Sequence, residues 1–121
     1  MMRLFFACIL LMLIGCNNND SHATNTTTTA VSGEQLFKIN CAQCHKPATD
    51  FAAPALAGVQ SRWASKDLLY RFVRNPEEVI RKDKYAFGLF IKWRQAPMQA
   101  FPNLSDAQID TILEYCNSYK Q

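Results

Sequence analysis

Two cysteines and a histidine lie close together in the middle of the chain, in the segment Cys41-Ala42-Gln43-Cys44-His45. Two thiols three positions apart, followed at once by a histidine, form the attachment signature of a c-type haem. The thiols can add to the two vinyl groups of the porphyrin, and the histidine can reach the iron as an axial ligand. Because the pattern occurs once, it predicts one haem, bound through Cys41 and Cys44, with His45 on the iron.

Two other chemistries use cysteines at this spacing. A redox dithiol normally lies near a strand-helix-strand pattern, and nothing in this sequence alternates like a half-buried strand. A zinc site needs a fourth ligand, and beyond Cys16 the only further cysteine or histidine is His22 or Cys116, neither at a zinc-finger spacing. Both alternatives are therefore disfavoured.

Residues 1–15 have the composition of an export signal. Arg3 precedes an apolar run from Leu4 to Ile14, which is too short to span a bilayer as a stable helix. Leu13-Ile14-Gly15-Cys16 resembles the lipobox of bacterial lipoproteins, which implies cleavage before Cys16 and acylation of that cysteine. An ordinary secretory leader, with Cys16 incidental, is the alternative. In both cases we expect export, and acylation would anchor the chain to a bacterial membrane with its domain facing the periplasm or the outside.

Residues 16–30 are rich in Asn and Thr and contain no large apolar side chain, which predicts a flexible, lipid-carrying tether. His22 lies inside it and is interpreted as a solvated linker residue. Residues 31–121 have room for one domain. Removal of residues 1–15 takes away Arg3 and no acid, so the net charge falls from +3 to +2. This modest charge, together with export, disfavours a nucleic-acid partner.

Basic residues are concentrated between positions 60 and 94, where nine of them accompany four acids. The basic residues are Arg62, Lys66, Arg71, Arg74, Arg81, Lys82, Lys84, Lys92 and Arg94, and the acids are Asp67, Glu77, Glu78 and Asp83. A local balance of +5 can form a docking patch for an acidic redox protein. A solvated surface spread over several faces would have the same composition, so both interpretations remain open.

Three segments of the predicted domain have the pattern of amphipathic helices. Two begin with Ser-x-x-Gln capping boxes, at Ser32 and at Ser105, and continue with apolar residues at helical spacing. A third is expected from Ser65 to Asn75, and Asn75-Pro76 can begin a further helix. Residues 82–95 lack clear periodicity and could form either a short helix or an apolar loop against a cofactor. The sequence thus predicts an all-α domain.

Met98 is the one methionine left after removal of residues 1–15, so a thioether ligand has a single candidate. It lies between Pro97 and Pro102, which stiffen a loop just before the last predicted helix. A lone methionine can also fill a gap in a core. We expect Met98 to be the second axial ligand of the iron.

With both ligand motifs identified, residues 31–121 resemble a class I cytochrome c, a small fold of three to five helices around one covalently attached haem. The first helix of that family carries a glycine and an aromatic, matched by Gly33 and Phe37, and an aromatic of the last helix, here Tyr115, packs across the glycine. Gln99 stands where the family often has a proline after the methionine.

The resemblance also implies contacts around the haem. A Gly-Pro-x-Leu turn follows the haem motif in the family, and Ala53-Pro54-Ala55-Leu56 corresponds to it with alanine in place of glycine. It implies that the Pro54 carbonyl accepts the N–H of the axial histidine and that Leu56 belongs to the cofactor-binding residues. Arg62 and Trp63 resemble positions that hydrogen-bond a haem propionate, although a tryptophan can simply pack.

Histidine and methionine together would leave the iron without an open position, which predicts outer-sphere transfer of one electron and no small-molecule substrate. We expect a membrane-tethered carrier, not an enzyme, between redox proteins of the respiratory or envelope electron-transfer chain. The alternative is a subunit of a haem enzyme, or a haem domain that reacts with gases or peroxide after displacement of its sixth ligand. The haem is expected to pack among apolar side chains, which are Leu36, Phe37, Leu56, Phe72 and Tyr115. Cys116, on the apolar stripe of the last helix, is expected to be buried and inert.

Overall fold

The computed structural model describes residues 31–119, so residues 1–15, the tether of residues 16–30 with its linker residue His22, and the lipidation site expected at Cys16 lie outside it. The described chain forms five α-helices and a 3₁₀ helix. They are α1 (Gly33–Asn40), the 3₁₀ helix η1 (Val59–Arg62), α2 (Lys66–Arg74), α3 (Pro76–Lys82), α4 (Lys84–Lys92) and α5 (Asp106–Asn117). Residues 31–119 contain no strand, which confirms the predicted all-α fold. None of the helices described is long and apolar enough to cross a membrane.

Side chains at the helix starts explain where the helices begin. Both expected capping boxes are present, and the Ser32 and Ser105 hydroxyls each accept a hydrogen bond from the backbone of the glutamine three residues on. Asn75 ends α2 and caps α3, whose first residue is a proline. Asp83 accepts from the N–H of Ala86 at 2.8 Å and so starts α4. The open question about residues 82–95 is therefore decided in favour of a helix over most of the segment.

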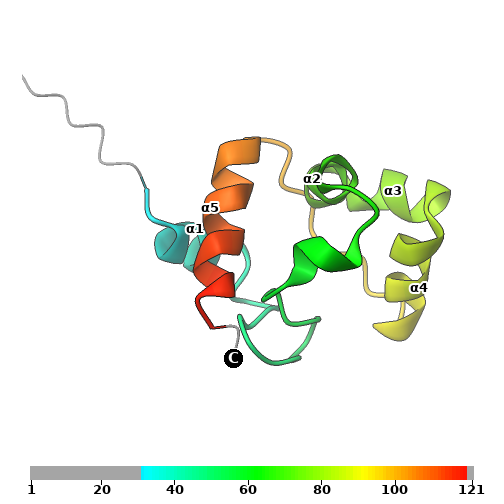
Figure 1. The fold of residues 1–121 in the computed structure, drawn as a ribbon. Helices are drawn as coiled ribbons and strands as arrows, with labels where there is room; N and C mark the ends of the chain where they lie inside the picture. The colour runs from blue at the N-terminus through cyan, green and yellow to red at the C-terminus, as the bar shows by residue number, and fades with distance from the viewer. Residues whose placement is uncertain (1–30, 120–121) are drawn as a thin grey trace, which may run out of the picture.

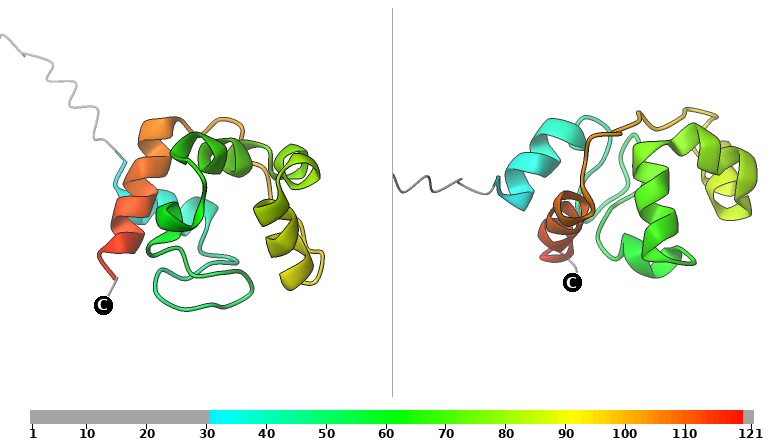
Figure 2. Two further views of the ribbon diagram at one scale, coloured as in Figure 1. Left: turned by 45° about the vertical axis from the view of Figure 1, so that its right-hand side comes forward. Right: turned by 90° about the horizontal axis from the view of Figure 1, so that it is seen from above.

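The first and last helices cross and form one side of the molecule (Figure 1). Gly33, at the start of α1, is buried against α5, and the Phe37 and Tyr115 rings lie 5.5 Å apart between the two helices. Helices α3 and α4 lie on the opposite side, as the turned views in Figure 2 also show. This is the glycine-aromatic packing that the family resemblance implied for the terminal helices.

The core consists of two clusters of buried side chains rather than one. The first cluster, between α1 and α5, contains Leu36, Phe37, Ile112 and Cys116. The second joins η1, α2, α3 and α4 to α5, and its buried members are Val59, Trp63, Leu69, Tyr70, Val79, Ala86, Ile109 and Leu113. Leu104 packs against both clusters. A group inserted between the two clusters would complete a single core.

Candidate haem site

An apolar cleft lies between the two core clusters and receives side chains from all five α-helices. Seven residues expected to attach, ligate or contact the haem line this one cleft, although they span more than half of the described chain. They are Cys41, Cys44, His45, Pro54, Leu56, Trp63 and Met98. The fold therefore brings the two ligand motifs together, as the sequence required.

A tight turn at the end of α1 positions the haem motif. The Cys41 N–H donates to the carbonyl of Phe37 at 2.8 Å, which continues the helix by one residue. The N–H groups of Cys44 and His45 then both donate to the Cys41 carbonyl, at 3.1 and 2.9 Å. This turn presents the two thiols and the imidazole to the same cleft, with Cys41 half-buried and Cys44 exposed.

A hydrogen bond to the following loop fixes the orientation of the His45 ring. Its Nδ1 lies 2.7 Å from the carbonyl oxygen of Pro54, and because a carbonyl can only accept, Nδ1 carries the proton. This leaves Nε2 unprotonated, with a lone pair for a metal. Burial lowers the pKa of His45, while the Pro54 hydrogen bond acts in the opposite direction. The neutral form that binds iron is thus favoured.

Residues 93–105, here called the methionine loop, carry Met98 from α4 to α5. The loop opens with two non-glycine residues in the left-handed region, Arg94 at φ 61° and Gln95 at φ 58°. The Gln95 N–H donates to the last turn of α4. Further on, the Phe101 N–H donates to the Val73 carbonyl at 3.1 Å, so the end of α2 supports the loop beyond Met98.

Arg74 ties the end of the methionine loop to α2 and α5. Its Nε donates to the carbonyl of Leu104 at 2.8 Å, and its guanidinium also pairs with the Asp106 carboxylate. Met98 is therefore held between anchored segments, and two prolines stiffen the backbone on either side of it. No local sequence signal indicates this role of Arg74, because the contact joins residues thirty positions apart.

Two tryptophans provide a test of whether a haem fits this cleft. The indole Nε1 atoms of Trp63 and Trp93 are buried and have no hydrogen-bond partner among the described residues. Buried N–H groups are normally satisfied, and both tryptophans line the cleft. A porphyrin combines an apolar body with two propionate carboxylates, which can accept these hydrogen bonds. The lining and its two unpaired donors therefore fit a haem.

Several expected contacts differ in the structure. Leu56 and Phe72 line the cleft, but Leu36, Phe37 and Tyr115 do not; they pack between α1 and α5. Arg62 is exposed, and its guanidinium donates to the carbonyl of Ala55 at 2.5 Å. Residue type alone favours Leu36, Phe37 and Tyr115 as haem contacts, but the crossing of α1 and α5 packs all three side chains between these helices.

The two alternative chemistries of the cysteine motif gain no support. Burial raises the pKa of the Cys41 thiol to about 11, whereas a redox dithiol needs a lowered pKa. Among residues 31–119, no group of three His, Cys, Asp or Glu side chains could hold a metal ion, so the described chain offers no zinc site. Cys116 is fully buried, as expected, and burial raises the pKa of its thiol to about 12.

Comparisons with known proteins agree with this geometry. A solved structure, a cytochrome c from Rhodothermus marinus, is 30% identical to the chain, with a TM-score of 0.59, and the match covers 72% of each chain. A comparison with curated proteins gave no match. Residues 30–120 match the family model for cytochrome c. The chain therefore belongs to the cytochrome c family, in its class I form with a small all-α fold.

Proposed function

We propose that this haem-based electron carrier of the cytochrome c family binds one haem, ligated by His45 and Met98, and works at a bacterial membrane. Membership of the family implies covalently bound haem c, for which Cys41 and Cys44 are the attachment residues in the proposal. When bound, the haem supplies reversible one-electron exchange between ferrous and ferric iron. Redox proteins of the respiratory or envelope chain would be its partners.

The observation that carries the proposal is the His45–Pro54 hydrogen bond of 2.7 Å in a cleft that also contains Met98. It selects the tautomer that can bind iron and holds the ring in one orientation. Met98 would supply a soft thioether, which favours the ferrous state relative to a second histidine. If His45 and Met98 both hold the iron, no coordination site would remain for a substrate. This favours a carrier over a gas-binding or peroxide-reactive domain.

Replacement of Met98 by alanine tests the ligation. We expect the reduced Met98→Ala holoprotein to bind carbon monoxide, with a shift of its Soret band, because the variant leaves one axial position open. The neighbouring variant Gln99→Ala is the control and should leave the reduced spectrum unchanged by carbon monoxide. Identical spectra of wild type and Met98→Ala, with and without carbon monoxide, would remove Met98 from the iron. Ready binding of carbon monoxide by the reduced wild type would favour the gas-reactive alternative.

Replacement of Cys16 by serine tests the anchor, which lies outside the described residues. The proposal predicts that wild-type holoprotein fractionates with membranes and that Cys16→Ser holoprotein is recovered in the soluble exported fraction, because no acyl chain can be attached. A red holoprotein that stays with the membranes after this substitution would reject lipid attachment at Cys16. Haem spectra of the two fractions keep this outcome separate from the outcome for the iron ligands.

A further inference from the structure

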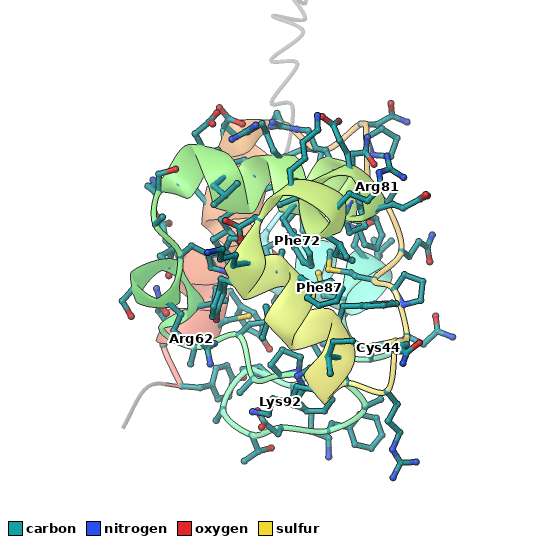
Figure 3. All side chains as sticks on the ribbon, turned by 90° about the vertical axis from the view of Figure 1, so that its right-hand side faces the viewer. Cys44, Arg62, Phe72, Arg81, Phe87 and Lys92 are labelled. Atoms are coloured by element: carbon teal, nitrogen blue, oxygen red, sulfur yellow. The ribbon has the colours of Figure 1, made fainter. Side chains whose placement is uncertain are left out.

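The exposed side of α4 has an unusual composition for the surface of a small domain. Phe87 and Ile91 are 52% and 50% exposed, although both are large apolar residues. Between them lies Gly88, where an added Cβ would meet nothing within 4 Å. The centre of this face is therefore apolar, with open space at Gly88. Figure 3 looks onto it, with α4 in front and Phe87 and Lys92 along the helix.

Cations that form no ion pair within the described chain lie at both ends of this apolar centre, although Asp83 directly precedes the first of them. Five of the nine basic residues between positions 60 and 94 form ion pairs, on α2 and α3 or across to α5, and Arg62 donates to a carbonyl. The three that remain, Lys84, Lys92 and Arg94, form no ion pair with any residue of 31–119. All three lie on α4 or directly after it, and α4 itself contains no acid. The local excess of charge is therefore concentrated at this helix.

The inner side of the same helix forms a wall of the haem cleft. Leu89 and Phe90 line the cleft, and Trp93, at the end of α4, contributes one of the two unpaired indole donors. Cys44, the exposed member of the haem motif, lines the same cleft. A protein bound to the outer side of α4 would thus be one helix away from the cofactor.

We propose that the outer face of α4, formed by Lys84, Phe87, Gly88, Ile91, Lys92 and Arg94, is the docking surface for a redox protein. The matching surface of that partner would be acidic at its rim and apolar at its centre. This inference rests on the proposed function, since it assigns the place where the carrier exchanges its electron. An apolar centre within a charged rim is the usual organisation of protein interfaces. Its apolar centre is small, with Phe87 and Ile91 as its large side chains, which suits a small interface that releases quickly.

An anionic membrane surface also attracts lysine and exposed aromatic side chains. A protein partner is favoured because α4 is a wall of the cleft, and lipid on its outer face would cover the route to the cofactor without offering a redox centre. A second copy of the chain is disfavoured because two copies of this face would bring Lys84, Lys92 and Arg94 against their own equivalents. The partner must therefore supply the negative charge.

The test measures reduction of the ferric holoprotein by a reduced plant-type [2Fe–2S] ferredoxin, an acidic redox protein, in stopped flow. One electron leaves the iron–sulfur cluster and one ferric haem iron becomes ferrous, so the reaction is balanced without a proton. We expect the second-order rate constant of Lys84→Gln/Lys92→Gln to fall about tenfold at low salt and to approach that of the wild type at high salt. Lys38→Gln/Arg71→Gln, with the same loss of charge on α1 and α2, should change it less than about twofold.

The apolar centre is tested with Phe87→Ser/Ile91→Ser, which removes exposed side chains and leaves the cations in place. We expect a slower reaction at every salt concentration, with an unchanged haem spectrum and reduction potential. Equal rate constants for Lys84→Gln/Lys92→Gln and Lys38→Gln/Arg71→Gln would overturn the proposal. It would also be overturned if wild-type holoprotein self-associated, or bound phosphatidylglycerol vesicles, in a manner that Phe87→Ser/Ile91→Ser abolishes. A wild-type spectrum that does not fit a haem bound by His45 and Met98 would instead count against the proposed function.

Discussion

Gly33 is the residue whose replacement should damage this fold most directly. An ideal Cβ at this position would lie 2.2 Å from the carbonyl oxygen of Thr111 and 2.9 Å from the Cβ of Tyr115. Both atoms belong to the rigid frame of α5, so no side-chain rotation can make room for a methyl group. Gly33→Ala must therefore push α1 away from α5 and weaken the packing of the α1–α5 cluster.

The expected cost follows from this geometry. Overpacking in a core costs roughly 1–3 kcal/mol, and the backbone contact puts Gly33→Ala at or above the upper end, at about 3 kcal/mol. Small domains have a free energy of unfolding of about 5–15 kcal/mol, so the expected loss is a large fraction of the total stability. For a domain of this size, a loss of about 3 kcal/mol corresponds to a fall in Tm of roughly 12–24 °C.

Gly88→Ala is a matched control for this experiment. It makes the same chemical change in a helix, but the added methyl group meets no atom within 4 Å. Removal of a glycine from a helix interior should stabilise the holoprotein by about 0.5–1 kcal/mol. The assay is guanidinium unfolding of the holoproteins followed by far-UV circular dichroism. A loss below about 0.5 kcal/mol in Gly33→Ala, or equal effects of the two substitutions, would refute the steric argument.

Three further predictions concern contacts within the domain. Arg74→Leu removes a charge-assisted hydrogen bond worth about 1.5–3 kcal/mol and should loosen the methionine loop. The reduced variant should therefore bind carbon monoxide, which the wild type should not. A variant spectrum that carbon monoxide leaves unchanged would contradict this. The Cys116 thiol, fully buried and with its pKa raised to about 12, should react with a thiol reagent only after unfolding, and labelling of native holoprotein would disprove it. A hydrogen bond from the Tyr70 hydroxyl, aided by a nearby lysine, lowers the pKa of Asp110. The contribution of this carboxylate to stability is therefore complete above the usual pKa of a carboxyl group, and it is lost as the pH falls through the lowered pKa. Unfolding curves at several pH values should therefore show a smaller acid-induced loss for Asp110→Asn than for wild type, and parallel losses would exclude this contribution.

Local sequence signals determined much of this protein. The haem motif, the serine capping boxes and the order of the helices each depend on residues within a few positions of one another, so they can be recognised without the fold. Met98 was identified as a candidate by composition alone, because the other methionines lie in the predicted leader. The family resemblance added the His45–Pro54 contact, and the structure places those two groups within hydrogen-bond distance.

Tertiary structure decided what depends on distant parts of the chain. Residues 82–95 have no clear periodicity because α4 exposes apolar residues on its outer side while it lines the cleft with its inner side. Which cations remain unpaired depends on contacts such as Lys66 with Asp110, which lie 44 positions apart. The burial of the Trp93 indole nitrogen without a partner among the described residues likewise depends on the segments that line the cleft, which are distant in the sequence. A sequence records which groups are present, but burial and pairing arise only when distant segments pack together.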